Sequence, residues 1–184
     1  MDAIERLEKA TAHAATKVAA IKPDQLSLPT PCAELDVRGL LNHLFAGLEM
    51  MTSAAQTGKG TVDPNVDRVA DDPGGSYAKG CEQMLNAFRA EDVMSKTLEM
   101  PFGAMPGENV AGIAFMEQLI HSWDIAKATG QDATLPEDLA TECLETFTPM
   151  DAMLRGPGVF GPKVEVAEDA PTTDRLVGFA GRTP

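Results

Sequence analysis

Three histidines occur in the sequence, and two of them lie in apolar segments with helical spacing. His43 lies in LLNHLFAGLEMM, and His121 lies in FMEQLIHSWDIAKATG, four positions after Glu117. Residues four apart on a helix project within roughly 40° of each other, so Glu117 and His121 share one face. Two imidazoles and one carboxylate can bind a divalent cation such as zinc, nickel or iron(II) and leave coordination positions open. The pattern therefore indicates a metal site at His43, Glu117 and His121.

Each part of this pattern also has an ordinary structural explanation. A Glu–His pair four residues apart is common on exposed helix surfaces, and a histidine on an apolar face is often a hydrogen-bonded core residue. If Glu117 points inward, its carboxylate needs a cation or strong hydrogen bonds, because burial without a partner costs several kcal/mol or causes protonation. A purely structural bundle, in which the polar residues fix the helix register, therefore stays an alternative.

Four further side chains also need an interpretation. Asp124, three residues after His121, either orients a ligand histidine or faces the substrate as a catalytic group. Cys32 precedes a helix start and is read as a packed thiol, although a helix N-terminus can lower a thiol pKa. Trp123 is expected to pack between helices, and His13 is read as an ordinary histidine on a helix face.

The positions of apolar residues, caps and prolines predict four substantial helices and a shorter fifth one. Asp36 is expected to cap the second helix, Ser76 the third, and Gly130 to end the fourth. Pro136 marks the start of the fifth. The expected helices cover residues 2–21, 36–58, 77–92 and 109–129, with the fifth following residue 136.

The connections between these helices are long. Residues 58–75 are rich in Gly, Pro and Asp, and a loop of this length in a compact domain is often functional, for example as a lid. Residues 93–108 contain a short strand-like run, and the tail contains KVEV, read as a short strand, before a final helical turn or two. We therefore expect an all-α, four-helix bundle with long connections, a short strand-like segment and a small C-terminal extension, forming a single domain over residues 1–184.

Composition narrows the classes of partner. With 28 acidic and 15 basic residues, the net charge is −13, which disfavours nucleic acid and anionic membranes as partners. Three widely spaced cysteines without a CxxC pair indicate reduced thiols rather than a disulfide framework. The N-terminal segment has no apolar core of a signal peptide, and no apolar run is long enough to span a membrane. A cytoplasmic location is the resulting expectation.

Three segments carry a resemblance to a known family: LPTPCAELDVRGLLNHLFAG, MEQLIHSWDIAKATGQDATLPEDL and the closing DRLVGFAGRTP. They resemble the DinB-like metal-binding superfamily, in its actinobacterial branch related to the metal-binding domain of mycothiol-dependent maleylpyruvate isomerase. The resemblance implies a four-helix bundle that holds a divalent metal, usually zinc or nickel, through His43, Glu117 and His121. It also implies that Asp124 is the counterpart of a functional aspartate.

The sequence departs from that branch in several ways. Leu35 replaces a tryptophan often found there, and Ser122 replaces a small residue of the H-G-W-D variant. The isomerase depends on arginines that no motif places here; Arg68 in the long loop and Arg155 before the tail are the two we consider. The isomerase also has a C-terminal domain for which this chain has no comparable length, so its particular reaction is not transferred.

The resemblance implies a metal-dependent thiol S-transferase or isomerase that activates a low-molecular-weight thiol, such as mycothiol, for attack on a small electrophile. The thiol requirement comes from the resemblance alone and not from residue spacing. A non-catalytic metal-binding or ligand-binding module is the alternative from another functional class. The sequence leaves open whether the protein forms a homodimer.

Overall fold

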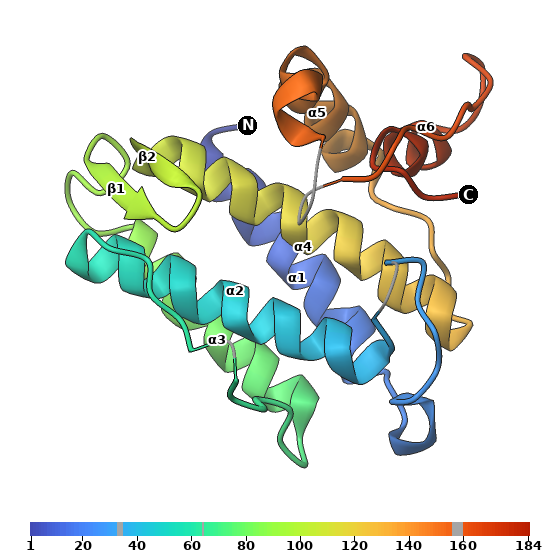
Figure 1. Cartoon of the computed structure of the whole chain (residues 1–184), viewed down its shortest axis with the longest axis horizontal. Coiled ribbons are helices and arrows are strands. Elements are labelled where there is room, and N and C mark those ends of the chain that lie inside the picture. Colours follow the sequence, from blue (N-terminus) through green and yellow to red (C-terminus); the bar gives the residue numbers. More distant parts are fainter. Residues whose placement is uncertain (33–34, 64, 156–159) are drawn as a thin grey trace.

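The computed structural model describes residues 1–32, 35–63, 65–155 and 160–184. Within these ranges four long helices form a bundle, with a two-stranded hairpin at one end and a small helical extension beside α4 (Figure 1). The α-helices are α1 (Ala3–Ala19), α2 (Val37–Thr57), α3 (Pro73–Phe88), α4 (Gly107–Thr129), α5 (Glu137–Phe147) and α6 (Thr172–Phe179). Two 3-10 helices, η1 (Pro23–Gln25) and η2 (Thr148–Leu154), and the strands β1 (Thr97–Met100) and β2 (Gly103–Pro106) complete the structure.

Helix α4 is the central element of the bundle. Every residue from 110 to 126 is buried except Ile113 and Glu117, because α1, α2 and the extension cover the rest of its surface. Helix α2 runs antiparallel to α4, and α3 packs against α1 and α2 (Figure 1). The expected all-α four-helix bundle with a C-terminal extension is confirmed.

The helix ends follow the expected local chemistry at three of four positions. The carboxylate of Asp36 accepts a hydrogen bond from Gly39 N at 2.7 Å, which caps α2. Gly58 and Gly130 end α2 and α4 in the left-handed region, with φ of 84° and 70°, where a side chain would be strained. The expectation for α3 was wrong: Asp72, not Ser76, caps it through Gly75 N at 2.9 Å.

The two expected strand-like segments have different outcomes. Residues 97–106 form an antiparallel hairpin of β1 and β2, and this hairpin packs against α2 and α4. The KVEV segment is not a strand: it has no strand partner in the described chain, and Val164 N instead donates to Gly178 O of α6 at 3.0 Å. A strand needs a neighbouring extended segment, and the tail places a helix there.

Residues 58–63 and 65–72 belong to the connection after α2, and polar contacts fix this connection along α2. Asp67 forms an ion pair with Arg38 at 2.5 Å and accepts a hydrogen bond from Asn42 Nδ2 at 3.1 Å. Arg68 N donates to Asn42 Oδ1 at 2.6 Å, and its side chain pairs with Glu49 at 2.7 Å. Despite this cover on α2, the His43 side chain stays 48% exposed.

Membrane-spanning segments were searched for among the described residues. None of the helices there combines the length and the apolar character needed to cross a bilayer.

Candidate metal centre

His43 on α2 and the pair Glu117 and His121 on α4 meet where α2 faces α4, on a side that is open to solvent. Glu117 Oε2 lies 2.9 Å from His43 Nε2 and 3.4 Å from His121 Nε2. The two imidazole rings are 5.0 Å apart between centroids and nearly perpendicular, at 80°. One donor atom from each of the three residues lies within 4.8 Å of the others. The structure therefore brings together the three residues that the sequence nominated.

These three donors fit a divalent cation. With metal–ligand bonds of about 2 Å, two donors of a tetrahedral site lie about 3.3 Å apart, which is close to the two distances from Glu117. Two neutral imidazoles and a carboxylate are donors that zinc and nickel accept. His43 is about half exposed and Glu117 is 30% exposed, so a small molecule can reach the open side of the site.

On α4, Glu117 and His121 each stabilise the charged form of the other. Burial raises the carboxyl pKa of Glu117, but hydrogen bonds to His121 and His43 outweigh burial and hold that pKa well below its usual range. Burial likewise opposes charging of His121, yet its hydrogen bonds to Asp124 and Glu117 raise its pKa to about 9. Without a metal, the site is therefore held together by a carboxylate and an imidazolium.

Asp124 lies behind His121 and has no exposed side-chain surface. Its Oδ2 is 2.9 Å from His121 Nδ1, and its pKa is lowered because hydrogen bonds to His121 and Arg182 outweigh the effect of burial. As an ionised carboxylate, Asp124 accepts a hydrogen bond from Nδ1–H of His121, and the Nε2 atom of His121 faces Glu117. This arrangement favours the orienting role for Asp124 over a substrate-facing one.

Arg182, three residues from the C-terminus, is the residue that sequence reasoning missed. It donates through Nη2 and Nε to the two oxygens of Asp124, at 2.9 and 3.2 Å, and through Nη1 to Ala180 O at 2.7 Å. A signal existed in the sequence, because a buried Asp124 requires a cationic partner. No spacing rule, however, points from α4 to a residue in the tail.

Cys32 is a further neighbour of His121 and Asp124. One donor atom of each of these three residues lies within 4.8 Å of the others. The thiol is half-buried, and burial together with the Asp124 charge raises its pKa. This agrees with the reading of Cys32 as a packed thiol rather than an activated nucleophile.

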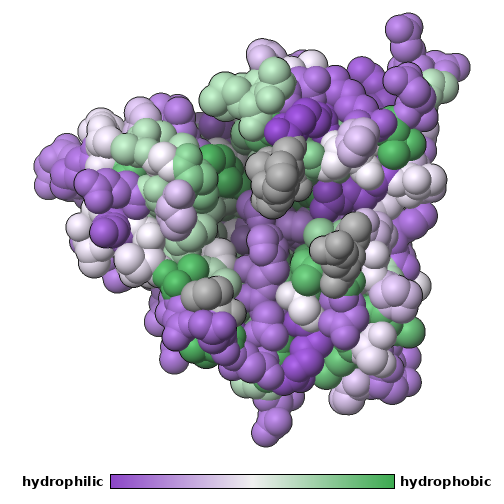
Figure 2. Space-filling view, viewed as in Figure 1, coloured by the Kyte–Doolittle hydropathy of each residue, from purple (hydrophilic) through white to green (hydrophobic). Residues whose placement is uncertain are grey.

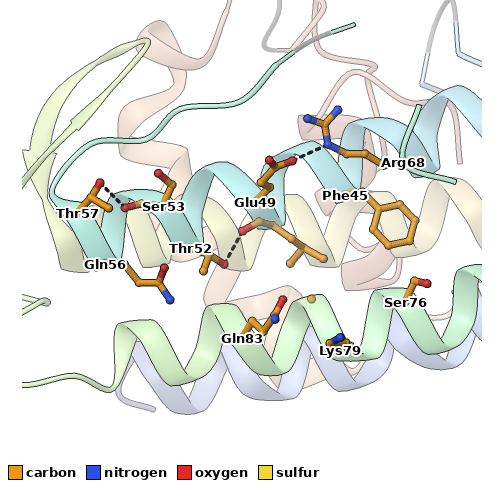
Figure 3. Close-up of a pocket in the computed structure, with 12 residues that line it drawn as sticks. Phe45, Glu49, Thr52, Ser53, Gln56, Thr57, Arg68, Ser76, Lys79 and Gln83 are labelled. Atoms are coloured by element: carbon orange, nitrogen blue, oxygen red, sulfur yellow. Dashed lines mark hydrogen bonds and ion pairs between the residues drawn. The ribbon is translucent and has the colours of Figure 1, made fainter. Parts of the chain in front are cut away.

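The two arginines considered from the sequence are engaged elsewhere. Arg155 pairs with Asp151 and donates to Phe179 O, within the C-terminal extension. Arg68 closes one side of a separate cavity of about 510 Å³ between α2 and α3, where Glu49 holds its guanidinium (Figure 3). Both arginines therefore have structural partners and do not contact the three proposed ligands.

The remaining residues singled out in the sequence have ordinary surroundings. Trp123 is 2% exposed, with Lys127 Nζ 5.3 Å from its ring centroid, which confirms its packing role. His13 is half-buried on α1, away from the cluster, and burial lowers its pKa. The three cysteines are free thiols, as expected.

The sequence matches one family model and two full-length relatives. The family described as mycothiol maleylpyruvate isomerase N-terminal domain matches residues 7–126, which include all three proposed ligands. Two uncharacterized proteins of Mycobacterium tuberculosis, from strains CDC 1551 / Oshkosh and ATCC 25618 / H37Rv, are each 31% identical over 187 residues. Each alignment covers 100% of this chain and 99% of the relative.

Two solved structures share the fold. One is a histidine-to-alanine mutant of the mycothiol-dependent maleylpyruvate isomerase, with a TM-score of 0.62 and 16% identity. The other is the same isomerase without that mutation, with a TM-score of 0.56 and 17% identity. Both alignments cover 85% of this chain and 72% of the solved chain. Family match and full-length relatives together show that this chain belongs to the mycothiol maleylpyruvate isomerase N-terminal domain family.

Proposed function

We propose that this protein is a divalent-metal enzyme that activates a low-molecular-weight thiol, of the mycothiol type, for attack on a small electrophile. The reaction class is S-transfer or, by addition and elimination, isomerisation. The observation that carries the proposal is the convergence of His43, Glu117 and His121 within 4.8 Å. Family membership supports the thiol, since the named relative of known activity is mycothiol-dependent.

Each residue has a distinct role in this proposal. His43 and His121 offer imidazole nitrogens and Glu117 a carboxylate to zinc or nickel, and the exposed side of His43 gives access to the thiol. A bound divalent ion supplies Lewis acidity, which lowers the pKa of a thiol coordinated to it. Asp124 and Arg182 fix the ring of His121, so both are positioning residues.

The competing function is a metal-binding or ligand-binding module without catalysis. The fold alone does not decide between the two, because related sites on one fold carry different activities. The half-exposed His43 and the partly exposed Glu117 favour the enzyme, since a purely structural ion would be enclosed by protein ligands.

The deciding experiment measures metal and thiol turnover on protein purified without a histidine tag. We expect about one zinc or nickel per chain in the wild type, loss of metal in His43→Ala and His121→Ala, and no loss in the matched control His13→Ala. The metal-replete protein should then consume mycothiol in the presence of an α,β-unsaturated aldehyde, and chelation should stop it. Metal without turnover would establish the binding module, and full metal content in both ligand variants would refute the proposed coordination.

A further inference from the structure

The open side of the candidate metal centre continues as an apolar strip toward the β-hairpin. On α4, the two residues between 110 and 126 that are not buried are Glu117 and, one turn before it, Ile113. On α2, the residues one and two turns after His43 are Gly47 and Met50, and both are partly exposed. On both helices, partly exposed apolar residues therefore follow the proposed ligands in the direction of the β-hairpin.

Gly47 leaves open space beside the proposed ligands. Gly47 projects about 40° from His43 around α2, on the side of the buried row Leu40, Leu44 and Met51 that faces the core. A Cβ built at Gly47 would have no atom within 4 Å, apart from its own helix backbone and chain neighbours. Open space therefore lies one turn from His43, on the side of α2 that turns toward α4.

The antiparallel course of α2 and α4 sets which residues face each other across this seam. The contact between His43 and Glu117 fixes the register of these antiparallel helices, so one turn further along, Gly47 is expected level with Ile113. Met50 follows on α2, and the partly buried Met105 lies on β2, just before α4 begins. From His43 to Met50 the strip is about 10 Å long, at 1.5 Å per helical residue.

The walls of this strip, Gly47, Met50, Met105 and Ile113, are all uncharged and apolar. Figure 2 shows a hollow near the middle of this face, with hydrophobic residues gathered on the side of the β-hairpin. The charged groups at the metal-centre end are the Glu117–His121 pair and the Asp124–Arg182 pair, and each charge there has an opposite partner. A substrate with two carboxylates would meet no unpaired cation along these walls.

We propose that this strip, the Gly47 trough, binds the apolar body of the electrophile and holds its reacting carbon at the metal centre. The inference rests on the proposed function for the reaction, and it adds the substrate class: an electrophile with an unbranched or flat hydrocarbon part of about 10 Å. The side chain missing at Gly47 makes room for it. Met50 and Met105 provide flexible thioether walls that adapt to different hydrocarbon shapes.

A metal-independent measurement locates the trough. Methionine-methyl NMR spectra of the protein with added 1-hexanol should show shifts for Met50 and Met105, but not for Met153, which is 76% exposed elsewhere. Gly47→Leu fills the gap and should abolish these shifts, whereas the matched Ala46→Leu, about 100° around the same turn, should preserve them. Shifts that are absent in the wild type, or unchanged in Gly47→Leu, would refute the trough.

A second measurement ties the trough to the metal. Acetohydroxamate and hexanohydroxamate are titrated into the cobalt(II)-loaded protein and followed by its visible spectrum. Each added methylene should tighten binding about twofold to threefold, because the trough covers part of the chain surface. Gly47→Leu should remove this gain and leave acetohydroxamate affinity within about twofold, since the shorter ligand does not reach the trough.

The outcomes separate the two proposals. If hydroxamates show the chain-length gain but mycothiol turnover is absent, the trough stands and the enzymatic function falls. If turnover occurs but chain length has no effect on hydroxamate affinity, the enzyme stands and the trough is refuted.

Discussion

Arg182 and Asp124, 58 positions apart in the sequence, form a two-point ion pair through Nη2–Oδ2 at 2.9 Å and Nε–Oδ1 at 3.2 Å. Both side chains are buried, with exposures of 7% and 0%. Because Asp124 also accepts a hydrogen bond from Nδ1–H of His121, the C-terminal tail is linked to the candidate metal centre by two successive contacts. The tail thus takes part in orienting a proposed ligand.

Arg182→Ala should weaken metal binding by about tenfold to 100-fold, the usual effect of losing a group that supports a ligand. It also leaves the Asp124 carboxylate buried without its cation, which should lower the free energy of unfolding by about 3–5 kcal/mol. Chelator competition measures the first effect and urea unfolding the second. Arg182→Lys keeps the charge but loses the planar fork of the guanidinium. Its metal affinity and its free energy of unfolding should therefore lie between those of the wild type and Arg182→Ala.

Arg175→Ala is the matched control for this prediction, because Arg175 is an exposed arginine on α6, in the same C-terminal extension as Arg182. It should change neither property. Added guanidinium should restore part of the metal affinity of Arg182→Ala if the contact with Asp124 is what matters. Equal metal affinity in Arg182→Ala and wild type would contradict the positioning role.

Metal affinity should rise with pH between 7 and 9. Despite the opposing effect of burial, hydrogen bonds to Asp124 and Glu117 raise the pKa of His121 to about 9. Below that pH the metal-free protein carries a proton on His121 that the ion must displace, so affinity should increase about tenfold per pH unit and level off above pH 9. Chelator competition across this range measures the slope, and a flat profile would contradict it.

Asp124→Asn tests the cause of that slope. The amide keeps the size of the side chain but removes the charge that favours the imidazolium. The pH above which metal affinity stops rising should therefore be lower in this variant. His13→Gln changes a histidine outside the cluster, whose pKa is lowered by burial, and should leave the profile unchanged.

The main helices and the three proposed ligands were predictable because their signals are local. Asp36 offers a cap at the start of α2, Gly130 a left-handed residue at the end of α4, and Glu117 and His121 one turn of spacing. Each of these features is set by a few neighbouring residues and by helix geometry. His43 was assigned to the same site from its place in an apolar helical segment, and the family resemblance supported that assignment.

The parts that the sequence did not predict depend on tertiary contacts. Ser76 and Asp72 are both good helix caps, and Pro73 at the first turn of α3 decides for Asp72. KVEV has strand-like composition, but its neighbour in the fold is a helix. Arg182 reaches Asp124 only because the extension folds back on α4, which no periodic pattern encodes.

The three cysteines should react with a thiol reagent in two classes. Burial raises the pKa of Cys81 and of Cys143 to about 12, so neither provides thiolate at neutral pH. Cys32 is half-buried and should be the thiol that reacts in the native protein, slowly because its own pKa is raised. A disulfide reagent at pH 8 should titrate about one thiol per native chain and all three in denaturant.

Cys32→Ser assigns the reactive thiol, because this variant should show no native reaction and two thiols after unfolding. Fast native labelling of Cys81 or Cys143 would show that the core opens around α3 or α5 and would contradict the assignment. Since Cys32 lies beside His121 and Asp124, its labelling rate in metal-loaded and metal-free protein also reports access to this side of the centre.

The buried hydrogen bond from the Tyr77 hydroxyl to Gln118 Oε1 should contribute measurably to stability. Tyr77 is fully buried on α3 and Gln118 is 3% exposed on α4, so neither group has access to bulk water. Tyr77→Phe removes the donor and leaves the amide oxygen unsatisfied, which should cost about 1–3 kcal/mol in urea unfolding. Tyr77→Phe combined with Gln118→Leu removes both partners and should recover most of that loss, because an apolar pair has no unsatisfied group. If the double variant is less stable than the single one by a further similar amount, packing rather than hydrogen bonding holds α3 against α4 at this point.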